Sequence, residues 1–266
     1  MAGNIILFPD YQKLKEEVEK LRIELSMLIL ERDQLRLVEC KNIEMLYMLK
    51  LGSLEYKAYE AQCAFLRLKR KMELIQAKKN RQEKIIMSQI EETLEAEFEE
   101  FQKKLEELIN QMNAAIERSR CDTLSAEENK ELKSLYFKIV KALHPDLNPN
   151  ITESQLELFY NAVSAYENGD LNTLRIINEL VSDPILPDNR KDAMTQLNDE
   201  KVQLYELLNT VKKSIEAIKS EFPYTAKELV NDPEKIEARK AELNGIIRQY
   251  EEAIAAYNAR IEKMLR

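Results

Sequence analysis

The chain has 266 residues, and its 48 acidic and 40 basic side chains give a net charge of −8, which excludes bulk attraction to nucleic acid or to an anionic membrane. It contains only four glycines, seven prolines and no tryptophan, whereas a fold rich in β-strands needs turn residues at short intervals. With 33% charged and 44% hydrophobic residues in long unpunctuated runs, the composition indicates an all-α, elongated protein of long helices and coiled coils rather than a disordered chain.

Residues 1–120 predict a long helical hairpin. Apolar side chains alternate at spacings of four and three residues in two segments, which is typical of a narrow stripe that packs on a partner helix. The first stripe comprises Leu14, Val18, Leu21, Leu25, Leu28 and Leu35, interrupted by Arg32; the second comprises Leu94, Phe98, Phe101, Leu105, Leu108, Met112 and Ala115. Gly52-Ser53 is the only turn signal between them, so we expect the chain to reverse there; a break near Lys79-Asn80 is the alternative.

Two further features of this segment leave alternatives open. The apolar pattern broadens over residues 43–68, which favours self-association through the hairpin tip, with a small local bundle as the alternative. Residues 67–84 are strongly basic and residues 91–100 strongly acidic. A basic helix face could bind nucleic acid, but we favour a solvated surface on which the two blocks pair, because few aromatic side chains accompany them.

Residues 121–183 predict a small domain of short, well-capped helices. Ser125 with Glu128, and Thr152 with Gln155, have the spacing of capping boxes at the starts of two helices. Pro145 must end the first helix, and Gly169 is suited to end the second. A short third helix follows over residues 171–180. The segment therefore predicts a compact antiparallel helical hairpin with an exposed, rigid loop at its tip.

Residues 184–266 follow a linker with prolines at 184 and 187 and predict a second antiparallel coiled-coil hairpin. Its first arm runs to Phe222, and Asp232 is placed to cap a second arm that begins at Pro233. The three cysteines are Cys40, Cys63 and Cys121, widely spaced and without a CxxC motif, which favours reduced thiols in a cytoplasmic protein over a disulfide scaffold or a zinc site. No run is long enough for a membrane span.

The loop of the middle domain carries the sequence His144-Pro145-Asp146, and His144 is the only histidine in the chain. A catalytic base would need a positioned nucleophile, and a metal ligand would need further ligands at a known spacing; the sequence shows neither. A residue that merely ends the helix is a third interpretation. We favour a fourth, a recognition loop in which proline holds an imidazole and a carboxylate for a protein partner.

These residues and their surroundings resemble the J domain of DnaJ-type co-chaperones. In that family, a tyrosine precedes the histidine of the loop by two helical turns, and the third helix carries a Phe-x-x-Ile-x-x-Ala-Tyr-Glu pattern. The matching positions here, which would form a J-like core, are Tyr136, Ile139, Leu143, Phe159, Ala165 and Tyr166.

The resemblance implies a function without catalysis or a cofactor. In the family, the loop contacts the ATPase domain of a DnaK-class heat-shock chaperone and stimulates its ATP hydrolysis, while basic side chains of the second helix meet an acidic patch on the chaperone. Here these contacts would come from His144, Pro145 and Asp146, together with Lys133, Lys138 and Lys141. The coiled coils would bind a client or self-associate.

The resemblance covers only about 60 residues, and several family features are absent. No first J-domain helix is recognisable, although Met112, Ala115 and Ile116 could pack in its place. Phe137 and Leu147 stand where the family has basic residues. A scaffold protein that keeps the J fold and has lost the chaperone contact therefore remains the alternative, and His144 buried against a coiled coil would favour it.

Overall fold

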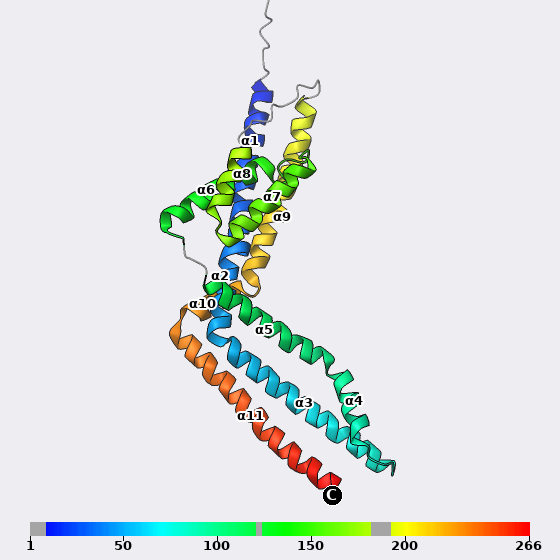
Figure 1. Cartoon of the computed structure of the whole chain (residues 1–266). Coiled ribbons are helices and arrows are strands. Elements are labelled where there is room, and N and C mark those ends of the chain that lie inside the picture. Colours follow the sequence, from blue (N-terminus) through cyan, green and yellow to red (C-terminus); the bar gives the residue numbers. More distant parts are fainter. Residues whose placement is uncertain (1–8, 121–123, 182–192) are drawn as a thin grey trace, which may run out of the picture. The chain divides into compact units, whose positions relative to one another are not determined.

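The structure, a computed structural model, describes residues 9–120, 124–181 and 193–266. Apart from turns, loops and bends, the described residues are helical and include no strand, which confirms the all-α fold class (Figure 1). They form two compact units: unit 1 holds the described residues of 1–41 and 122–225, and unit 2 those of 42–121 and 226–266. Cys121 and the linker at residues 183–188 lie outside the described residues. Within the described residues, no helix is both long enough and apolar enough to cross a membrane.

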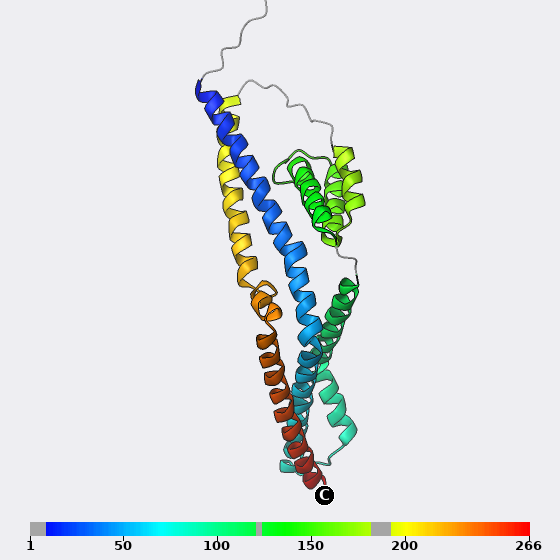
Figure 2. The ribbon, with the colours of Figure 1, turned by 90° about the vertical axis from the view of Figure 1, so that its left-hand side faces the viewer.

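The units do not follow the predicted division into 1–120, 121–183 and 184–266. Each long helix of the last segment packs on a helix of the first: α9 (Ala193–Ser220) packs on α1 (Pro9–Asp33) in unit 1, and α11 (Pro233–Leu265) packs on α3 (Ser53–Asn80) in unit 2 (Figures 1 and 2). The predicted antiparallel hairpin of residues 184–266 is therefore wrong.

Ion pairs show why α1 selects α9. Most of the predicted stripe is buried in α1, although Leu28 is half-buried and the neighbouring Ile29 is fully buried. Leu204, Leu208, Val211 and Ile215 of α9 are buried in the same cluster. Along its edge lie the pairs Glu17–Lys201 at 2.6 Å, Glu24–Lys212 at 2.9 Å and Glu31–Lys219 at 2.9 Å. The residue numbers rise together, so α1 and α9 run parallel. Heptad spacing predicts a stripe but leaves its partner open, and here complementary charges flank the pair.

The chain does not reverse at Gly52, as the sequence had led us to expect. It is helical through α2 (Cys40–Tyr47), the π-helical segment η2 (Met48–Gly52) and α3. It turns only at residues 81–86, where Gln82 has a φ of 56°. This is close to the alternative break near Lys79-Asn80.

The turn leads into α4 (Met87–Glu97) and α5 (Glu99–Ser119), which return along α3. A Cβ atom on Gly52 would lie 3.0 Å from Cγ of Met112. The glycine thus allows close helix packing rather than a turn.

The opposite-charge blocks of unit 2 pair across α3 and α4, as we favoured. Glu91 lies 2.6 Å from Arg67 and 2.5 Å from Lys71, and Arg70 lies 2.8 Å from Glu97. The broad apolar segment also packs locally: Leu51 and Ala58 are buried in one cluster with Ile236 and Leu243 of α11. Packing within unit 2 therefore accounts for these members of the broad pattern.

Replacing Gly245 by Ala is expected to raise the free energy of unfolding of unit 2 by about 1 kcal/mol, because glycine is the poorer helix former by that amount. Gly245 lies inside α11 and a Cβ atom there would meet nothing within 4 Å. Chemical denaturation followed by circular dichroism measures the change. Gly52→Ala is the matched control, because the crowding by Met112 offsets the same gain; an equal gain at both sites would contradict the packing at Gly52.

The middle segment folds as the predicted hairpin. Helix α6 (Ala126–Leu143) and α7 (Glu153–Asn168) each begin with both hydrogen bonds of a capping box, at Ser125 and Thr152 respectively. Gly169 ends α7 with a φ of 70°, and α8 (Leu171–Val181) packs on both helices. The remaining short segments are η1 (Gln34–Glu39), a π-helical continuation of α1, and η3 (Tyr224–Ala226) and α10 (Lys227–Asn231), which lead to α11.

Candidate partner-binding loop

The loop after α6 is closed by hydrogen bonds around His144. Its backbone turns to an extended conformation there, with φ −64° and ψ 128°, as a residue before proline prefers. The His144 carbonyl accepts from the N–H groups of Leu147 at 3.0 Å and Asn148 at 2.9 Å. The Asn148 side chain donates to the Lys141 carbonyl at 3.1 Å, which covers one of the carbonyls that the helix end leaves without a partner. Backbone and side-chain hydrogen bonds therefore tie the loop to the end of α6.

The imidazole of His144 is part of this support. The side chain is buried, with 6% of the residue exposed, and its ring lies edge-on to the ring of Phe159 at 5.1 Å between centroids. Nδ1 accepts a hydrogen bond from the backbone N–H of Asp146 at 3.1 Å. An Nδ1 that accepts leaves the proton of the neutral ring on Nε2. His144 thus holds the backbone of Asp146 in place.

Electrostatics keep this ring neutral. Burial lowers the pKa of His144 from its ordinary value of 6.5, and the nearby Arg32 lowers it further, while the carboxylates of Asp146 and Asp33 act in the opposite direction. The net direction is downward. The neutral imidazole that the hydrogen bond requires is therefore the form present at neutral pH.

Stability is expected to fall with acidity in a window set by His144. Because its pKa is lower in the folded than in the unfolded chain, the unfolded chain binds the proton first as the pH drops below about 6.5. The resulting loss, at most about 1.4 kcal/mol per pH unit, begins there and continues down to the folded-state pKa. Denaturation at pH 7.5, 6.5 and 5.5 measures it.

The variant His144→Gln provides the control for this pH dependence. It removes the only histidine, so its free energy of unfolding should change less over the same range. Identical slopes in the two proteins would contradict the buried neutral ring.

The remaining predicted contact residues differ in their exposure and in their ion pairs. The Asp146 side chain is 41% exposed and Pro145 is half-buried. Lys138 is exposed and Lys133 is half-buried, and neither makes an ion pair with any residue that the structure describes. Lys141 is exposed but lies 3.5 Å from a carboxylate oxygen of Glu19 on α1. The structure brings the loop and α6 lysines onto one hairpin.

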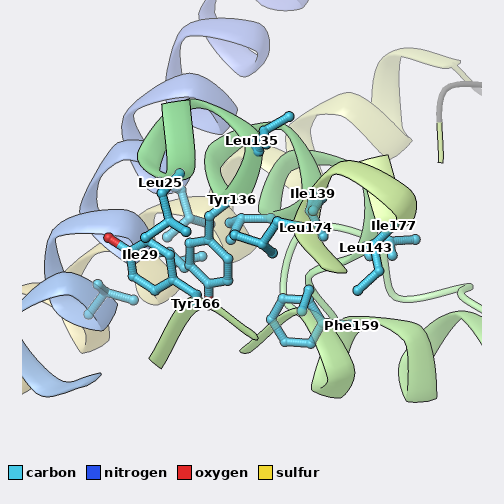
Figure 3. Packing of buried hydrophobic residues seen from close by; sticks show 14 of the residues in the cluster. Leu25, Ile29, Leu135, Tyr136, Ile139, Leu143, Phe159, Tyr166, Leu174 and Ile177 are labelled. Carbon is cyan, nitrogen blue, oxygen red and sulfur yellow. The ribbon is translucent and has the colours of Figure 1, made fainter. Parts of the chain in front are cut away.

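All the predicted core residues are buried in one hydrophobic cluster, and Figure 3 labels each of them except Ala165. Their exposed fractions lie between 0% and 6%, for Tyr136, Ile139, Leu143, Phe159, Ala165 and Tyr166. The rings of Tyr136 and Tyr166 stack at 4.1 Å with an interplanar angle of 9°. The cluster extends to Leu25 and Ile29 of α1. The hairpin thus packs on α1, whereas Met112 and Ala115, which we expected to pack in place of a first J-domain helix, belong to the packing of unit 2.

A buried hydrogen bond joins the hairpin to α1, and sequence reasoning missed it. The hydroxyl of Tyr136 donates to Oδ2 of Asp33 at 2.8 Å, and Oδ1 of Asp33 accepts from the Arg32 guanidinium at 2.7 Å. Burial raises the pKa of Tyr136, and the Asp33 charge raises it further, so the phenol stays a donor. The one signal in the sequence was the polar interruption of the apolar stripe at Arg32.

The described residues contain no group of three or more histidine, cysteine and acidic side chains that could hold a metal ion. What the loop offers is an exposed carboxylate on a rigid turn beside exposed lysines. Comparisons of the chain with models of protein families, with curated proteins and with solved structures found no match.

Proposed function

We propose that this protein is a J-domain-like co-chaperone of the cytoplasm that binds a DnaK-class heat-shock chaperone and stimulates its ATP hydrolysis. The observation that carries the proposal is the His144-Pro145-Asp146 loop itself. It stands at the tip of a doubly capped helical hairpin and is closed by hydrogen bonds, with the Asp146 carboxylate exposed. A loop used only to connect two helices has no need for this arrangement.

The side chains would act in different ways. Lys138 and Lys133, together with Lys141 when it is free of Glu19, would attract an acidic patch on the chaperone and speed the encounter. Asp146 would make the specific contact. His144 would act through the loop, because its ring is buried and its Nδ1 holds the Asp146 N–H. The long helices would bind a client or a second copy of the chain.

Single-turnover ATP hydrolysis by a DnaK-class chaperone tests the proposal. Native protein should accelerate hydrolysis, and Asp146→Asn and His144→Gln should each abolish most of the acceleration. Asn150→Asp is a matched control, because it changes an exposed residue of the same loop that makes none of these contacts. No acceleration at saturating concentration, with the protein folded by circular dichroism, would reject the proposal.

A scaffold protein that keeps the J fold for packing is the second candidate, and two observations favour it. His144 is buried, and Lys141 is already paired with Glu19 of α1. The His144 ring packs on Phe159 of its own hairpin, however, so its burial also serves the loop. A scaffold would leave the rate of hydrolysis unchanged for native protein and for every variant.

A further inference from the structure

Helix α1 covers part of the hairpin surface to which the chaperone contact is assigned. Two polar contacts fix it there: the buried hydrogen bond from Tyr136 to Asp33 and the exposed ion pair of Lys141 with Glu19. Between these contacts, Leu25 and Ile29 lie in the cluster with Tyr136 (Figure 3).

One of the proposed contact lysines of α6, Lys141, is already engaged by α1 through its ion pair with Glu19. Lys133 and Lys141 are eight residues apart, which places them on one stripe of the helix with Phe137 between them. Phe137 and Lys133 are both half-buried, and Lys141 is held by Glu19. An acidic partner that approached this stripe would compete with Glu19 of α1 for Lys141.

We propose that α1 is a built-in cover of the hairpin, and that the hairpin must leave α1 before the chaperone can bind the whole lysine stripe of α6. This inference rests on the proposed co-chaperone function. We call the hydrogen bond between Asp33 and Tyr136 the latch of this cover. Glu19 occupies the position beside Lys141 that an acidic residue of the chaperone would take.

The chemistry of the latch suits a contact that opens. Asp33 and Tyr136 are both polar, so each can exchange its partner for water when the hairpin leaves, which makes release less unfavourable than for a purely apolar face. In the docked state, however, removing Asp33 leaves the buried Tyr136 hydroxyl without its acceptor, and removing the hydroxyl leaves Oδ2 of Asp33 without its donor. The pair therefore favours the docked state strongly only while both members are present.

Mass action gives the consequence for binding. If only a fraction of the molecules has released the hairpin, the apparent affinity for the chaperone falls by that same fraction. A change in α1 that weakens docking should therefore strengthen chaperone stimulation, although the hairpin itself is unaltered.

The experiment uses full-length variants changed only in α1. Asp33→Ala removes the acceptor of the latch, and Glu19→Lys turns the ion pair into a repulsion with Lys141. Glu24→Lys is the matched control, because Glu24 is an equally exposed glutamate of α1 whose partner is Lys212 of α9. Two quantities are measured: hydrogen exchange of the α6 backbone, and the concentration of each protein that gives half-maximal single-turnover hydrolysis by a DnaK-class chaperone.

We expect Asp33→Ala to lower the half-maximal concentration by about tenfold and to speed exchange in α6. Glu19→Lys should lower it by about two- to threefold, as befits an exposed ion pair. Glu24→Lys should match native protein in both measurements.

The other outcomes separate the two proposals. Faster exchange in Asp33→Ala with a half-maximal concentration equal to that of native protein would overturn the cover and leave the co-chaperone function standing. Unchanged exchange would overturn the latch. Faster exchange with no stimulation by either protein would overturn both proposals.

Discussion

Ile29→Ala should lower the free energy of unfolding of unit 1 by about 3 kcal/mol, because it removes buried methyl and methylene groups and leaves a cavity. Ile29 is fully buried in α1, in the cluster that α1 shares with α9 and with the hairpin of α6 and α7. Helix α1 thus stabilises both α9 and the hairpin. Chemical denaturation followed by circular dichroism gives the change, and hydrogen exchange in α6 shows whether the hairpin is affected.

Met27→Ala is the control for this prediction. Met27 lies on the same helix but is 59% exposed, so its loss should change stability by no more than about 0.5 kcal/mol. A large effect at Met27 with a small effect at Ile29 would show that α1 turns a different face to its partners.

The stacked tyrosines provide a second prediction, in which one atom removed from each ring has opposite effects. Tyr136→Phe should lower the free energy of unfolding by about 2 kcal/mol, because it leaves the buried Asp33 carboxylate without one of its donors. Tyr166→Phe should leave it unchanged or raise it by about 1 kcal/mol, because the Tyr166 hydroxyl is buried and has no hydrogen-bond partner. Both variants keep the ring stack.

Each tyrosine variant serves as the control for the other, since the two rings lie in the same cluster and lose the same atom. Denaturation at neutral pH measures both. Burial raises the pKa of Tyr166 to about 12, and that of Tyr136 is raised as well, so neither phenol is ionised in this measurement. Equal losses in the two variants would contradict the hydrogen bond to Asp33.

Local features of the fold could be predicted from the sequence because they depend on neighbouring residues. Both capping boxes, the helix end at His144 and the left-handed Gly169 are encoded within a few positions of where they act. The buried positions of the hairpin, from Tyr136 to Tyr166, are those that the resemblance implied.

The pairing of the long helices could not be predicted in the same way. An apolar stripe requires a partner helix without specifying which one. The sequence predicts a turn at Gly52, whereas in the fold this glycine allows close packing against Met112. The reversal instead uses residues 81–86, where Gln82 takes the positive φ that glycine more often supplies.

The candidate site was predictable in its residues but not in their exposure. The motif indicated His144, Pro145 and Asp146, but only the fold shows that the His144 ring is buried on Phe159 and that Asp146 is the exposed member. Asp33 lies 103 positions from Tyr136, and a contact over that separation leaves no periodic trace in one sequence.

Carbodiimide coupling of the native protein tests most directly whether the hairpin rests on α1. The reagent joins an amine to a carboxylate only when the two are in contact, and Lys141 lies 3.5 Å from Glu19. Mass spectrometry of the digested protein should find an amide between these two residues. The pairs Lys201–Glu17 and Lys212–Glu24, which join α1 to α9, serve as internal controls in the same sample. Coupling of the controls without coupling of Lys141 to Glu19 would contradict the docked hairpin.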